Sequence, residues 1–329
     1  MPTTNPEVDG GRLRRALRHL QDWIERDEVP SINALVLHHG KEIARYSGGN
    51  AAPDSLYYLA SITKPITATA AMLLFQDGEL LLDDPVSDYV PQLASWAPER
   101  RAIHVRHLLT HTSGLPDMVP ENLELRRRFA GLEEFAASAC RAPLLFPPGT
   151  RVSYSSAGML LLSRVVEKIC GRPLQLLMAD RLFRPLGLGT MTYHLPYRDF
   201  WRVARLWLRP GTAPAPWDNN SPYWRRLGAP WGGIASTVDD TSSIGQFFLD
   251  LRTGHQGARR DLMSPDVVRR MASPQTAGLP AERSVAENWG LGWALGAHWM
   301  GDLATLETFG HVGASGTMLW MDPPRSLVC

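Results

Sequence analysis

The chain has 329 residues, of which 44% are hydrophobic and 20% are charged, and this ordinary globular composition excludes disordered, collagen-like and coiled-coil proteins. Its 34 basic and 33 acidic side chains nearly cancel, which leaves a net charge of +1. Without a charge field of either sign, the chain is not expected to bind nucleic acid or an anionic membrane surface.

Hydrophobic spacing predicts three elements in the first third of the chain: an amphipathic helix, a β-hairpin and a buried helix. They are expected over 12–26, over 31–38 paired with 43–46, and over 62–76. The last of these is apolar or small on all sides, which is typical of a helix inside a core. Gly78 provides its C-terminal stop.

The middle of the chain is expected to be mainly helical. Further helices are predicted over 105–109, 132–140 and 157–170, with a Pro- and Gly-rich rigid connector between the last two. Together with the buried helix they predict a helical lobe over 61–210.

The last third of the chain changes character. Five of the eleven tryptophans fall within 200–231, a helix is expected over 238–253, and strand-like pieces follow at 290–298 and 313–321. Strands are thus expected near both chain ends. We predict an α+β fold in which residues 1–60 plus 211–329 form an antiparallel sheet flanked by helices, with the helical lobe inserted between them.

Cysteine content and apolar runs exclude further classes. Cys140, Cys170 and Cys329 form no CxxC pair and are too few and scattered for a disulfide framework or a zinc site. No stretch of 18 apolar residues occurs, and the N-terminus carries no apolar signal core before a cleavage site. These features predict a soluble cytoplasmic protein without a membrane span.

A nucleophile and a base are paired at the start of the buried helix. Ser61 and Lys64 stand three residues apart, so on a helix they share a face. Serine needs a base within hydrogen-bond reach, and a lysine in an apolar lobe loses its charge readily. The free N–H groups of a helix N-terminus suit an oxyanion. The simpler alternative is a helix-capping serine beside a solvated lysine.

Two more segments carry candidate chemistry. Tyr154 precedes the predicted helix at 157–170, and a neighbouring cation could hold its phenol as a phenolate base; otherwise it is a packed loop tyrosine. The small residues of 310–314 could let a substrate backbone approach a strand edge, or could form a β-bulge.

In chain order, Ser61-x-x-Lys64, Tyr154-x-Ser156 and His311-x-Gly313 resemble the three motifs of the serine β-lactamase and penicillin-binding-protein superfamily. Connecting segments resemble its class C-related branch, which includes family VIII esterases and D-aminopeptidase-like hydrolases; these segments are 78–85, 108–115, 146–149 and 233–240. The resemblance covers nearly the whole chain and implies a β-lactamase/transpeptidase-like fold.

The resemblance also implies catalytic roles. Ser61 would be the acylated nucleophile, Lys64 its proton partner, and Tyr154 the general base that relays a proton to the leaving group. The backbone N–H groups of Ser61 and Ala314 would form the oxyanion hole. Which of Lys64 and Tyr154 takes the first proton stays open, because two coupled groups titrate as a pair.

The substrate-binding positions depart from the lactamase pattern. The resemblance implies that Ser156, in place of an asparagine, contacts substrate together with His311 and Gly313. His311-Val312-Gly313 replaces Lys-Thr-Gly, so the cation is only partial near pH 7 and the threonine hydroxyl is missing. The motif therefore binds the carboxylate of a β-lactam or of a D-Ala-D-Ala terminus poorly, and a neutral ester or amide fits better.

We therefore predict a serine hydrolase that cleaves a small ester or amide through an acyl-Ser61 intermediate, a carboxylesterase in preference to a lactamase or peptidase. The alternatives are an acyltransferase of the same fold, a β-lactamase or D-peptidase, and a penicillin-binding protein that acylates once without turnover. The tryptophans of 200–231 either line an acyl or alcohol pocket or hold a loop against the core.

The resemblance implies no cofactor and no metal. His104, His107 and His111 have spacings that suit a metal, but their segment resembles a structural turn of the superfamily. Relatives continue past the equivalent of 321–323 into one more strand and a helix, whereas this chain stops at Cys329. An uncovered apolar sheet face predicts a homo-oligomer or a marginally stable protein.

Overall fold

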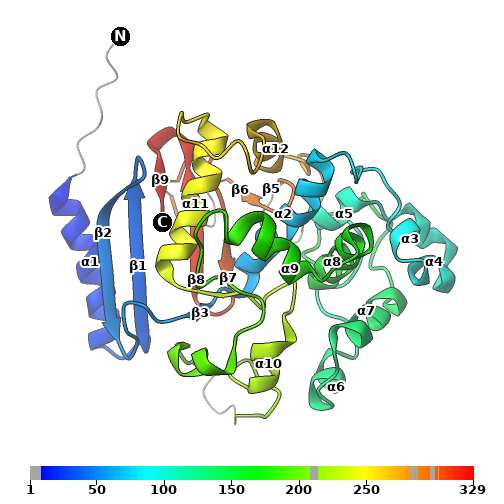
Figure 1. Cartoon of the computed structure of the whole chain (residues 1–329), viewed down its shortest axis with the longest axis horizontal. Helices are drawn as coiled ribbons and strands as arrows, with labels where there is room; N and C mark the ends of the chain where they lie inside the picture. The colour runs from blue at the N-terminus through cyan, green and yellow to red at the C-terminus, as the bar shows by residue number, and fades with distance from the viewer. Residues whose placement is uncertain (1–8, 208–213, 282–285, 287, 297–300, 303) are drawn as a thin grey trace.

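The computed structural model describes residues 9–207, 214–281, 286, 288–296, 301–302 and 304–329. Seven strands form an antiparallel sheet in the order β2-β1-β9-β8-β7-β6-β5, and β3 pairs separately with β4. Figure 1 shows this sheet on one side of the molecule and most helices gathered on the other. The predicted α+β architecture with a helix-flanked antiparallel sheet is confirmed.

The strands are β1 (Ser31–His38), β2 (Lys41–Gly49), β3 (Tyr57–Tyr58), β4 (Ala235–Ser236), β5 (Asn288–Trp289), β6 (Ala294–Leu295), β7 (Phe309–Gly313), β8 (Thr317–Asp322) and β9 (Leu327–Val328). The α-helices are α1 (Gly10–Glu25), α2 (Thr63–Gln76), α3 (Val86–Tyr89), α4 (Gln92–Trp96), α5 (Val105–Leu109), α6 (Asn122–Arg127), α7 (Leu132–Arg141), α8 (Ser156–Cys170), α9 (Leu174–Met178), α10 (Pro222–Leu227), α11 (Val238–Thr253) and α12 (Pro265–Met271). Short 3-10 or π turns are η1 (Ala60–Ile62), η2 (Pro98–Ala102), η3 (Ala179–Phe183), η4 (Tyr197–Arg202) and η5 (Pro323–Arg325).

The hairpin and the long helices lie where their spacing predicts them. His39 and Gly40 join β1 to β2 with φ values of +50° and +72°, the conformation of a tight hairpin turn. Helix α2 is buried over 63–74 and contacts α8, as its all-round apolar sequence requires. Helix α11 covers the sheet so closely that a Cβ on Gly245 would lie 2.7 Å from Val328.

The predicted strands at the C-terminal end are wrong in detail. The segment 290–298 is not one strand but a tight turn between β5 and β6, because Gly292 has φ +93°. Residues 297 and 298 lie outside the described residues. The segment 313–321 is likewise divided, since Gly313 ends β7 and Gly316, at φ +83°, turns the chain into β8.

Strand β9 lies inside the sheet, where Val328 pairs with both Leu37 of β1 and Met321 of β8. None of the described helices combines the length and hydrophobicity needed to cross a bilayer. The boundary between the two predicted lobes falls at 210, among residues 208–213, which are outside the described part, so the division into lobes stays a prediction. The predicted self-association also stays a prediction.

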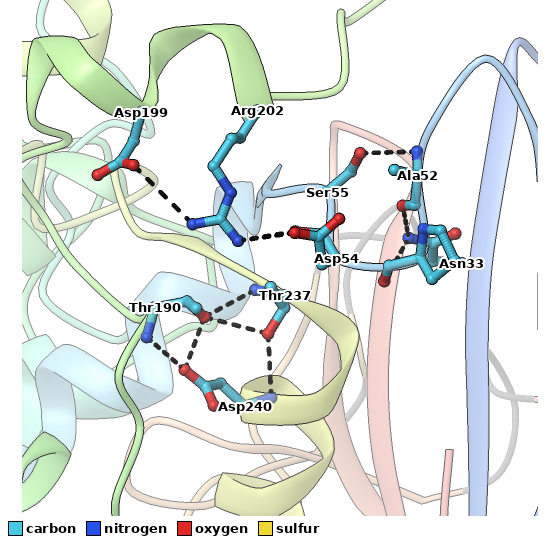
Figure 2. Close-up of polar contacts among 10 residues, drawn as sticks. Asn33, Ala52, Asp54, Ser55, Thr190, Asp199, Arg202, Thr237 and Asp240 are labelled. Carbon is cyan, nitrogen blue, oxygen red and sulfur yellow. Dashed lines mark hydrogen bonds and ion pairs between the residues drawn. The ribbon is translucent and has the colours of Figure 1, made fainter.

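Two polar clusters link segments that lie far apart along the chain. Figure 2 shows Arg202 between Asp54 and Asp199, at 3.3 Å and 3.9 Å. In the same view, the backbone N–H and the hydroxyl of Thr190 each donate to Asp240 at 2.6 Å. These contacts tie the segment before β3 and the start of α11 to the long connection after α9.

A cavity of about 460 Å³ lies beside these clusters, lined in part by Arg184, Arg198 and Arg202. Each of these arginines is already paired with a carboxylate, of Asp180 or Asp199 among others. The cavity therefore offers no unpaired cation, and its lining includes none of the predicted site residues.

Candidate active site

Ser61 lies in the turn η1, directly before α2. The preceding residue, Ala60, has φ +45°, a left-handed conformation that is uncommon for alanine. Backbone strain of this kind persists where the surrounding structure over-determines it, and it gathers at functional sites. The strained turn thus lies directly before the serine whose hydroxyl contacts Lys64.

Lys64 is buried beside this serine, with 1% of its surface exposed. Its Nζ lies 3.1 Å from the Ser61 Oγ and donates to the Trp231 carbonyl at 2.9 Å. Burial lowers the pKa of Lys64 to about 7, against a smaller opposing effect of Asp117. Near neutral pH a large fraction of the amine is therefore uncharged and has a lone pair for the Ser61 proton.

Tyr154, in the segment before α8, completes the polar group. The Lys64 Nζ lies 4.5 Å from the centre of its ring. Burial raises the pKa of Tyr154 strongly, while its hydrogen bond with Ser61 lowers it by less and Asp117 raises it further. The phenol is therefore protonated in the resting site.

The end of β7 packs tightly against the turn that carries the serine. A Cβ on Gly313 would lie 2.3 Å from the Leu59 carbonyl and 2.2 Å from the Thr317 hydroxyl. Thr317 in turn donates to the same Leu59 carbonyl at 2.9 Å. Only glycine permits this approach, which places the segment carrying Ala314 beside the turn carrying Ser61.

His311, in the middle of β7, faces Tyr154 and is buried. Its Nδ1 lies 2.7 Å from the Val312 carbonyl, which can only accept, so Nδ1 carries the proton. Its Nε2 then accepts from the Tyr154 hydroxyl over a long 3.4 Å. Burial, followed by the nearby Lys64, lowers the pKa of His311 to about 3. The ring is neutral at working pH.

Residues 13–329 match the family model described as Beta-lactamase. The chain belongs to the Beta-lactamase family. It is 33% identical over 288 residues to Penicillin-binding protein 4 of Amycolatopsis lactamdurans, which covers 85% of this chain and 70% of that protein. Esterase EstB of Burkholderia gladioli is 35% identical over 180 residues, 47% of this chain and 45% of EstB.

Solved structures share the fold of this chain. EstCE1, described as a hydrolase with promiscuous acyltransferase activity, superposes with a TM-score of 0.77 at 22% identity, covering 97% of this chain and 92% of EstCE1. The predicted β-lactamase/transpeptidase-like fold is thereby confirmed. The chain is thus a member of a serine hydrolase family, and the proteins similar to it include one named as a penicillin-binding protein and one named as an esterase.

Asp117 and the Trp231 carbonyl are neighbours of the site in this Beta-lactamase family member that the sequence did not indicate. Asp117 accepts from both the N–H and the hydroxyl of Ser156, at 3.0 Å and 2.7 Å, so the Ser156 hydroxyl is already engaged. The Trp231 carbonyl holds Lys64. Neither has a sequence signal, because one is a lone carboxylate in a loop and the other is a backbone atom.

The three histidines with metal-like spacing are separated by the fold. The rings of His104 and His107 stack at 5.3 Å at the start of α5, whereas His111 packs against Tyr154. Over the described ranges, no three His, Cys, Asp or Glu side chains converge as metal ligands.

The tryptophans of 200–231 divide between core and surface. Trp224 and Trp231 are buried, whereas Trp201 and Trp207 are exposed. Trp231 lines a cavity of about 10 Å³ next to Ser156, which has room for about one water molecule. Most of this window therefore packs the loop or faces solvent, and Trp231 is the tryptophan of this window that borders the site.

Replacing Gly313 with alanine is expected to lower kcat/KM by about 10²-fold, because the added methyl group must push the end of β7 away from Ser61. Steady-state ester hydrolysis measures the loss. Gly189→Ala is the matched control, since a Cβ there meets nothing within 4 Å and the backbone is not left-handed. Wild-type kinetics in Gly313→Ala would show that this approach has no part in catalysis.

Proposed function

We propose that this chain is a serine hydrolase that cleaves a small carboxylic ester through an acyl-Ser61 intermediate. The contact between Ser61 and a buried Lys64 with a pKa of about 7 supports nucleophilic catalysis. The observation that carries the choice of an ester is the state of His311. It is neutral and buried at the position where lactamases have a permanent cation, so nothing in this motif attracts a substrate carboxylate.

In the proposed acylation, the neutral Lys64 amine takes the proton from the Ser61 hydroxyl as Oγ attacks the ester carbonyl. The N–H groups of Ser61 and Ala314 receive the negative charge that develops on the carbonyl oxygen. Lys64, now an ammonium, gives a proton to Tyr154 while the phenol gives its own to the departing alkoxide. The alcohol leaves, and Ser61 carries the acyl group.

Deacylation reverses the proton path. A water molecule attacks the acyl-Ser61 carbonyl and gives its proton to the basic Lys64–Tyr154 pair, and the Ser61 oxygen recovers a proton as the acid leaves. The raised pKa of Tyr154 supports this course, because it favours a protonated phenol that relays protons and disfavours a permanent phenolate. In this proposal Lys64, and not Tyr154, takes the first proton. The sequence had left this order open.

A second candidate is acylation by a penicillin, which is favoured by the 33% identity to a protein named for penicillin binding. Parallel assays with p-nitrophenyl butyrate and nitrocefin separate the two functions. We expect ester turnover with an initial burst, and nitrocefin hydrolysis slower by about 10²-fold or more. Comparable nitrocefin turnover, or a stable penicilloyl adduct in the intact-protein mass, would contradict the esterase assignment.

The pH dependence of the ester reaction follows from Lys64. The amine is an acceptor only when deprotonated, and burial sets its pKa at about 7, so kcat/KM should rise with pH and reach half its plateau near pH 7. Initial rates from pH 5.5 to 9, corrected for hydrolysis by Ser61→Ala, measure the curve. A flat profile or a falling one across this range would exclude Lys64 as the base.

A further inference from the structure

His111 holds the chain on both sides of Tyr154. Its carbonyl accepts from the N–H of Ser153 at 2.9 Å, and its ring Nδ1 accepts from the N–H of Ser155 at 3.2 Å. One fully buried residue from the turn after α5 therefore anchors both peptide groups that flank the phenol-bearing residue.

The His111 ring also contacts the phenol ring itself. The centres of the His111 and Tyr154 rings lie 4.7 Å apart, and the Trp289 ring stands edge-on to His111 at 4.4 Å. Trp289 approaches Tyr154 as well, with 5.7 Å between ring centres. The direction of the Tyr154 side chain is thus set by two packed rings in addition to the two backbone anchors.

This arrangement carries two local costs. His111 has φ +57°, which favours glycine or asparagine. Because Nδ1 accepts, the neutral ring carries its proton on Nε2, and this buried atom has no hydrogen-bond partner within the part of the chain that the structure describes. Packing alone does not explain the buried unpaired donor, since a phenylalanine ring would fill the space without one.

The ring must stay neutral to accept from Ser155, and its surroundings ensure this. Burial keeps the pKa of His111 well below its ordinary value, and the nearby Lys64 and His311 lower it further. The acceptor therefore persists over the whole range in which Lys64 changes charge.

We infer that His111 is a positioning residue that holds the Tyr154 phenol where it can protonate the leaving group of the substrate. The inference rests on the proposed function, because that function gives Tyr154 its proton transfer. It predicts a defect that depends on the leaving group. An alkoxide must be protonated as it departs, whereas p-nitrophenolate leaves without a proton.

The test compares kcat/KM for ethyl butyrate and p-nitrophenyl butyrate. His111→Phe keeps a ring but loses the acceptor, and we expect about a 30-fold loss with the ethyl ester and about 3-fold or less with the aryl ester. Tyr154→Phe should show the same pattern more strongly. His111→Asn keeps an acceptor atom at the Nδ1 position and tolerates the left-handed backbone, so it should remain within about 3-fold of wild type on both esters.

His107→Phe is the matched control. The Nδ1 of His107 also accepts from a backbone N–H, that of His104 at 3.1 Å, but in a turn that does not flank Tyr154. The same substitution there should change the two esters equally, whatever it does to stability.

An unchanged ratio of ethyl to aryl hydrolysis in His111→Phe, or a defect in His111→Asn as large as in His111→Phe, would overturn the inference. If His111→Phe does not fold, His111→Asn and His111→Ala decide it, since the asparagine variant should exceed the alanine variant on the ethyl ester by about tenfold. A wild-type protein inactive on both esters would instead refute the proposed function, and the inference with it.

Discussion

Replacing Ser61 with alanine is expected to reduce kcat/KM for p-nitrophenyl butyrate by about 10⁴- to 10⁶-fold. The variant lacks the only atom at that position able to form the acyl bond, so the Lys64–Tyr154 pair is left without a nucleophile to activate. Intact-protein mass spectrometry shortly after mixing should show a butyryl adduct on the wild type and none on the variant.

Ser95→Ala controls for loss of a serine as such. Ser95 is exposed on α4, far from the candidate active site in sequence, and its hydroxyl donates to the Pro91 carbonyl at 3.1 Å, so rate and adduct should match the wild type. A butyryl adduct on Ser61→Ala, or residual turnover above about one hundredth of the wild-type rate, would place the nucleophile elsewhere.

The helices whose positions the sequence predicts correctly are those marked by local features such as capping residues and apolar composition. The predicted range 238–253 coincides with α11, where Thr237 caps the N-terminus and Gly254, at φ +74°, ends the helix. The buried helix also lies where its composition indicates. Hydrophobic runs near the C-terminus were less informative, because Gly292 and Gly316 turn the chain inside segments whose composition resembles a continuous strand.

The candidate active site also has a part that the sequence predicts and a part that only the folded structure shows. The motif residues Ser61, Lys64, Tyr154 and His311 are within contact of one another, as a resemblance to ordered motifs predicts. Their surroundings depend on tertiary placement, which no spacing encodes. The anchoring of Tyr154 by His111 joins residues 40 or more positions apart along the chain, and it becomes visible only once the loops are folded together.

Replacing Lys64 with methionine should lower kcat/KM by on the order of 10³-fold, because the Ser61 hydroxyl loses its proton acceptor. The rise of activity near pH 7 should disappear in the residual rate. Lys168→Met is the matched control, since that lysine is exposed on α8 and should leave both the rate and the pH profile unchanged. A Lys64→Met profile that still rises near pH 7 would assign that titration to another group.

The same variant should be more stable than the wild type, by about 1–4 kcal/mol at pH 6.5, because methionine fills a buried site without desolvating an amine. Burial lowers the pKa of Lys64 from about 10.4 in the unfolded chain to about 7 in the folded protein. Between these values the unfolded chain binds the extra proton, so the cost of Lys64 is complete below pH 7 and shrinks as pH rises. Urea unfolding at pH 6.5 and 9.5 should therefore show the advantage of Lys64→Met falling with pH. A variant less stable than wild type at pH 6.5, or an advantage independent of pH, would mean that Lys64 is not held at a cost for its chemistry.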